Sequence, residues 1–149
     1  MQLIRAAAAG LMLVALASTA EAACLVGIST PGLLGLSQDG KTLSSAGGLG
    51  TPSIVTISNL PIGTSTITLA NPRLDSPGGT TPGATLSGTY AASWLLGGSN
   101  GSITPNTPGA FQISLLSSLA VTITLNNTAF STGGFRQGTH TMKTSVTCS

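Results

Sequence analysis

Few side chains in this 149-residue sequence could perform catalysis. Beyond residue 22 it has one histidine, two aspartates and no glutamate. A hydrolytic triad would have to combine His140 with Asp39 or Asp75 and one of many serines, most of which alternate with apolar residues as solvent-facing strand positions do. A glycosidase pair of carboxylates would have to be the two aspartates, which both stand in turn sequences where Asp serves the backbone. We therefore expect no enzymatic activity and no catalytic residue.

Metal and cofactor sites are not expected either. A transition-metal site takes three or four His, Cys or carboxylate ligands, which this chain supplies only together with a second molecule. Calcium needs more acidic oxygens than Asp39 and Asp75 provide. His140 stands near the start of the last apolar-alternating segment, and we interpret it as a rim residue of the domain.

Three residues are candidate ligand contacts. Arg73 and Asp75 stand two positions apart, so an extended segment would place them on one face as a surface ion pair, or as part of an exposed recognition loop. Tyr90 and Trp94 are the only tyrosine and tryptophan. Their spacing on a strand predicts that both fill the core, and the alternative is a platform on which a carbohydrate stacks.

Two cysteines bracket the chain. Cys24 and Cys148 allow one intramolecular pairing, and a bridge between molecules or a reactive thiol is the alternative. No His or Lys stands close enough in sequence to lower either thiol pKa, so we predict a disulfide.

The first 22 residues have the pattern of a secretory signal peptide. Arg5 supplies a positive start, Leu11 to Ala17 a short apolar run, and Ala20-Glu21-Ala22 a small-x-small cleavage site. The apolar run is shorter than the roughly 20 residues of a membrane span. We expect residues 1–22 to be removed, and residues 23–149 to form one secreted or periplasmic domain with no transmembrane segment.

The composition excludes two classes of protein. The chain is 41% hydrophobic and 5% charged, whereas an ordinary domain is about 25% charged. Intrinsic disorder needs the opposite balance, so a buried core is expected. The cations beyond the leader are scattered and cannot neutralise a row of phosphates, so nucleic acid is not an expected partner. They are Lys41, Arg73, Arg136 and Lys143.

Apolar residues recur at every second position, which predicts strands and almost no helix. The expected strands lie around 24–28, 55–58, 66–69, 86–94, 111–115, 121–125 and 139–148, and the expected turns include 71–72, 76–79 and 97–101. The segment from Leu33 to Gly50 is predicted as a long loop or frayed edge. About seven short strands in one domain favour a single antiparallel β-sandwich of immunoglobulin-like type, and a small barrel is the alternative.

The leader, the start at Ala23-Cys24, the Thr-rich alternating strands and the closing segment from Gly138 to Cys148 together carry a resemblance. The chain resembles small secreted bacterial β-sandwich proteins of the pilin-like, spore-coat-U type. That resemblance implies assembly on the cell surface by a chaperone and usher, with strand exchange between subunits. The mature chain has almost no residues before Cys24 to serve as a donor strand, which departs from the pattern.

These observations predict a secreted, non-enzymatic structural or surface-associated protein, most typical of bacteria. Edge strands with so few charges have little protection against pairing with another chain. The expected partners are other protein subunits, including copies of this chain, or cell-surface polysaccharide. The alternative function is an extracellular carbohydrate-binding module that uses Trp94 or Tyr90.

Overall fold

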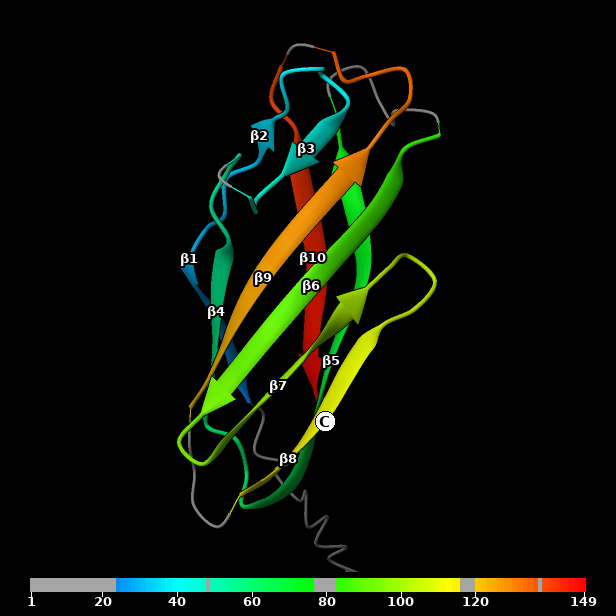
Figure 1. Ribbon diagram of the computed structural model, residues 1–149. Helices are drawn as coiled ribbons and strands as arrows, with labels where there is room; N and C mark the ends of the chain where they lie inside the picture. The colour runs from blue at the N-terminus through cyan, green and yellow to red at the C-terminus, as the bar shows by residue number, and fades with distance from the viewer. Residues whose placement is uncertain (1–23, 48, 77–82, 116–119, 137) are drawn as a thin grey trace, which may run out of the picture.

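The computed structural model describes residues 24–47, 49–76, 83–115, 120–136 and 138–149, and these form strands without any helix (Figure 1). The predicted leader lies outside the described residues. The strands are β1 (Leu25–Thr30), β2 (Gly35–Leu36), β3 (Thr42–Ser44), β4 (Ser53–Ser58), β5 (Gly63–Asp75), β6 (Thr85–Trp94), β7 (Gly97–Ile103), β8 (Gly109–Leu115), β9 (Val121–Phe130) and β10 (Thr141–Cys148). The all-β prediction is confirmed. The described part of the chain contains no helix of the length and apolarity that crossing a bilayer requires.

The strands form two antiparallel sheets. In the larger sheet β9 pairs along one side with β6, which in turn pairs with β7. The other side of β9 is shared, because β4 pairs with its first half and β3 with its second half. β1 then lies outside β4, and β2 outside β3. The smaller sheet has the order β10-β5-β8.

The inner faces of the two sheets enclose the core, and strand alternation decides which residues reach it. In β9 the residues from Val121 to Ala129 alternate between buried and more exposed positions, as a strand with one core face should. A larger apolar cluster joins both sheets and includes Ile57, Ile67 and Ile123. A smaller cluster consists of Leu43, Leu74 and Ala129.

The structure differs from the predicted boundaries at two glycine-rich segments. Residues 97–101 were expected to form a turn, but they begin β7, and the turn is Leu95–Leu96. Glycine is needed there because a Cβ on Gly101 would lie 2.8 Å from the Tyr90 ring. The segment 33–50, predicted as a loop, contains the short strands β2 and β3, which gain their hydrogen bonds from β9 and from each other.

The expected turn at Asn71-Pro72 is a bulge inside β5. The register between β5 and β10 steps from Arg73↔Lys143 to Ala70↔Ser145, so the two turn residues have no single partner. Asn71 adopts φ 52°, a left-handed conformation that asparagine tolerates. The missing N–H of Pro72 therefore costs the sheet no ladder hydrogen bond.

Candidate interaction groove

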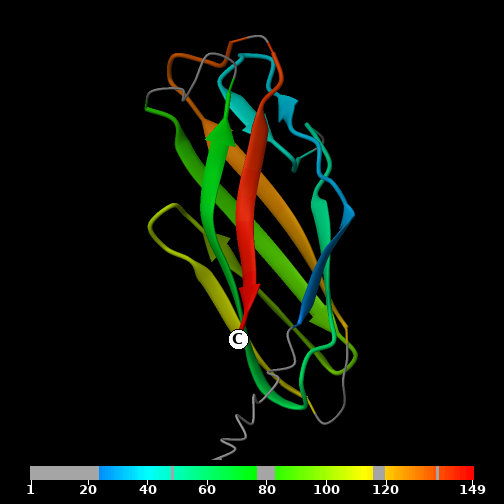
Figure 2. The same cartoon turned by 180° about the vertical axis from the view of Figure 1, so that it is seen from behind.

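Two neighbouring edge strands belong to different sheets. Among the described residues β1 pairs only with β4, and β10 pairs only with β5. The predicted disulfide between Cys24 and Cys148 is confirmed and joins the start of β1 to the end of β10, with the two Cα atoms 6.6 Å apart. From that end the two strands diverge, β1 in blue and β10 in red (Figure 2). No described strand pairs with their facing edges.

A cavity of about 390 Å³ lies between these two edges. Val26 and Ile28 line it from β1, and Met142 and Val146 line it from β10. All six residues of β1 are exposed, with Val26 at 41% and Ile28 at 73%. Val55 of β4 contributes to the inner wall. The apolar alternation of a half-buried strand is therefore present in β1, but no strand in the described part of the chain covers its apolar side chains.

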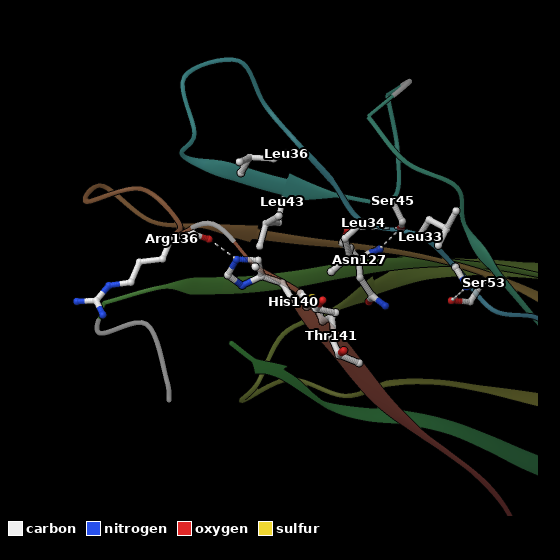
Figure 3. A pocket seen from close by; sticks show the side chains of 14 residues that line it. Leu33, Leu34, Leu36, Leu43, Ser45, Ser53, Asn127, Arg136, His140 and Thr141 are labelled. Atoms are coloured by element: carbon white, nitrogen blue, oxygen red, sulfur yellow. Dashed lines mark hydrogen bonds between the residues drawn. The ribbon is translucent and has the colours of Figure 1, made fainter. Parts of the chain in front are cut away.

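A second cavity, of about 560 Å³, continues the first along β10. The residues that line both are Gly32, Ser53, Asn127, Thr141 and Met142. Leu34, Leu36 and Leu43 line the second cavity on the side of β2 and β3, and His140 and Thr141 line it opposite them (Figure 3). We call the two cavities together the groove. It follows β10, and most of its lining surface is apolar, with Arg136 at the second cavity and Lys143 at the first as its charged residues.

Asn127 lies where the two cavities meet, and sequence reasoning did not single it out. It occupies an inward position of β9 between Leu125 and Ala129, and it is 7% exposed. Its backbone N–H donates to Ser45 Oγ at 2.8 Å, and its carbonyl accepts from the Ser45 N–H at 3.0 Å. Thr144 Oγ1 donates to its side-chain Oδ1 at 3.4 Å. The detectable signal was a polar residue at a position where the alternation calls for an apolar one.

His140 lines the groove, and two hydrogen bonds and one ring contact hold its side chain. Its Nε2 donates to the Arg136 carbonyl at 2.8 Å, and its Nδ1 shares a hydrogen bond of 3.0 Å with Ser76 Oγ. Its ring meets Phe135 edge to face at 5.5 Å between ring centroids. Neither aspartate is among these contacts. The described residues contain no cluster of three or more His, Cys, Asp or Glu that could hold a metal ion.

Sequence reasoning overlooked one serine with the spacing of a hydrolase nucleophile. Ser99 stands in Gly97-Gly98-Ser99-Asn100-Gly101, which matches Gly-x-Ser-x-Gly. A nucleophile elbow requires a sharp turn from a strand into a helix. In the structure these residues all belong to β7 and pair with β6, so the pattern does not form that turn.

Asp75 is the centre of a small surface ion cluster. The Lys143 ammonium lies 2.6 Å from its carboxylate, and the Arg73 guanidinium lies 3.9 Å from it. The expected Arg73–Asp75 ion pair therefore forms, and Lys143 makes a shorter contact with the same carboxylate. The hydrogen bond and charge of Lys143 lower the pKa of Asp75. Asp39 is held separately in its turn, where the Ser37 hydroxyl and then the Lys41 N–H lower its pKa. The two aspartates thus belong to separate local networks.

The two scarce aromatic residues, Tyr90 and Trp94, line neither cavity of the groove. Tyr90 is 5% exposed and stacks on Phe111 with ring centroids 5.5 Å apart. Trp94 is partly buried and stacks on the same ring at 6.0 Å. Gly109 of β8 approaches the Tyr90 ring so closely that a Cβ there would lie 2.5 Å from it. Aromatic rings thus fill the space between β7 and β8, whereas the space between β1 and β10 is open.

Comparison with protein families, with curated proteins and with solved structures finds no match for this chain. The resemblance to pilin-like surface proteins therefore stays a prediction.

Proposed function

We propose that this chain is a secreted, non-enzymatic structural subunit whose groove accepts an extended strand from another protein chain. The observation that carries the proposal is the open, apolar space between the unpaired edges of β1 and β10. A strand laid there would pair with edge N–H and C=O groups and bury alternate side chains, which is the β-augmentation mode of peptide recognition. The two sheets then act as an immunoglobulin-like β-sandwich that a partner strand completes.

The side chains of β1 support this role. Its sequence, Leu-Val-Gly-Ile-Ser-Thr, contains no charged residue and no proline, and no helix of the described residues covers it. Charges, prolines and covering helices are the features that usually protect exposed sheet edges. Burying a Val or Ile side chain fully contributes about 1.5–3 kcal/mol relative to leaving it in water. Covering Val26 and Ile28 therefore supplies a driving force for docking, and the backbone hydrogen bonds supply direction.

The composition and the disulfide support an extracellular setting. A bridge between Cys24 and Cys148 persists in oxidising compartments, which fits export by the predicted leader to a bacterial periplasm or cell surface. The partners that fit the groove are other subunits of a surface assembly, including copies of this chain. The carbohydrate-binding alternative depends on Trp94 and Tyr90, and both rings are engaged in packing against Phe111, which favours strand docking.

A synthetic peptide tests the proposal. The peptide Lys-Thr-Val-Thr-Thr-Thr-Val-Thr-Lys alternates apolar and hydroxyl side chains about a central threonine and is similar in length to β10. We expect saturable binding to the oxidised protein, with NMR amide shifts concentrated in β1 and β10. Ile28→Lys should weaken binding about tenfold or more, because it places a charge in the apolar groove.

Leu25→Lys is the matched control. Leu25 is on the same strand and 60% exposed, but it does not line the groove. The Leu25→Lys variant should bind the peptide with the same affinity as the wild-type protein. Absence of saturable binding, or equal effects of the two lysine variants, would contradict the proposed function.

A further inference from the structure

Asn127 interrupts an otherwise apolar face of β9. Val121, Ile123 and Leu125 precede it on that face and Ala129 follows, all of them buried. Leu125 belongs to the larger apolar cluster and Ala129 to the smaller one, so Asn127 stands between the two. Space for its side chain comes from Gly88 on β6, where a Cβ would lie 2.8 Å from Asn127 Oδ1. The absence of a side chain at Gly88 therefore leaves room for the Asn127 amide.

The hydrogen bonds of Asn127 leave its side-chain NH₂ group unused as a donor. The backbone groups are paired with Ser45, and Oδ1 accepts from Thr144. In the structure Oδ1 faces Thr144, and Nδ2 points away from it. Among the described residues no acceptor takes the Nδ2 hydrogens. The Asn127 side chain extends away from Ser45 into the groove that it lines (Figure 3).

A docked strand would bring side chains, not carbonyls, to this nitrogen. Backbone carbonyls of a strand lie in the plane of its sheet and would face β1 and β10, whereas alternate side chains point down to the floor of the groove. Asn127 belongs to that floor. The acceptor that reaches Nδ2 is therefore a side-chain oxygen of the incoming strand.

We propose that Asn127 sets the register of the docked strand by donating a hydrogen bond from Nδ2 to a side-chain oxygen at the strand's centre. The inference rests on the proposed function and names its partner: an extended segment with the pattern apolar-x-acceptor-x-apolar, where the acceptor is Ser, Thr, Asn or Gln. One apolar side chain lies near Val146 and the larger cluster, and the other near Met142 and the smaller cluster. The pattern reads the same in both strand directions.

A polar contact is needed to fix the register, because the alternation of apolar side chains repeats every two residues and does not distinguish one register from the next. A shift of the strand by two residues would keep every apolar side chain on the inner face. With Asn127 in the floor, the same shift places an apolar side chain against the unpaired amide. A buried donor without a partner is costly, so one register is preferred over its neighbours.

Two isosteric peptides test this role on the wild-type protein. The threonine-centred peptide is compared with Lys-Thr-Val-Thr-Val-Thr-Val-Thr-Lys, which replaces the central hydroxyl by a methyl group. We expect the threonine-centred peptide to bind about tenfold tighter in calorimetric titrations, because the valine leaves Nδ2 buried and unpaired. Equal binding, or tighter binding of the valine-centred peptide, would overturn the proposal without affecting strand docking.

The variant Asn127→Leu completes a double-mutant cycle. Leucine has a similar branched shape and restores the apolar alternation of β9, so the variant should lose the threonine preference and favour the valine-centred peptide. The same threonine preference in the variant would overturn the register role. Binding of neither peptide to the wild-type protein would refute strand docking itself, and the register role with it. The wild-type comparison decides the question even where the variant does not fold.

Discussion

Replacing both Cys24 and Cys148 with serine tests the stability that the terminal bridge contributes. The bridge links residues 124 positions apart, almost the whole described chain. The chain-entropy model assigns about 5 kcal/mol to a loop of this length, because the cross-link removes conformations from the unfolded state. The total stability of a domain is typically about 5–15 kcal/mol, so the variant should lose a large part of it.

Urea unfolding followed by Trp94 fluorescence and far-ultraviolet circular dichroism measures this loss. Trp94 stacks on Phe111 beside the larger cluster and so reports on packing of the core. Adding reductant to the wild-type protein should reproduce the variant's transition, and the same reductant should leave the variant unchanged. A difference below about 1 kcal/mol between oxidised protein and variant would refute the loop-entropy reasoning.

Three further changes have expected outcomes. Ser65→Ala should raise the free energy of unfolding by about 1 kcal/mol in calorimetry, because the buried Ser65 hydroxyl makes no hydrogen bond with any described residue; a loss would contradict this. Gly109→Ala should lower it by about 1–3 kcal/mol in urea, because the new Cβ would lie 2.5 Å from the Tyr90 ring, and unchanged stability would show that the ring moves freely. The lowered pKa of Asp75 stabilises the fold above the ordinary value of 3.8, and this contribution is lost as the pH falls through the folded-state pKa. Lys143→Met should therefore reduce the fall in melting temperature on acidification, and an identical pH profile would count against the ion pair.

Local alternation explains why most strands were predictable. In β4 and β8 each apolar side chain that faces the core is two residues from the next, and that period is visible in the sequence. The pairing of Arg73 with Asp75 also followed from spacing along one strand. The contact of Lys143 with Asp75 did not, because β5 and β10 are far apart in the sequence.

Two local signals were outweighed by tertiary packing. Glycines in 97–101 are typical of a turn, yet they are in β7 because the Tyr90 and Trp94 rings occupy the space where side chains would be. Asn71 and Pro72 are also typical of a turn, yet β5 continues through them as a bulge, since β10 pairs on both sides of it. In each case contacts with a neighbouring strand determined the local conformation.

The sequence by itself determined the strand class, the one intramolecular pairing open to two cysteines and the scarcity of catalytic and metal-binding residues, since each follows from residue type, residue number or short-range spacing. Only the tertiary structure decided that the edges of β1 and β10 lie side by side with a groove between them, and that Asn127 stands at its middle. Sheet pairing joins residues far apart in the sequence, such as Thr42 and Phe130, and period-two alternation says which face of a strand is buried but not which strand lies next to it.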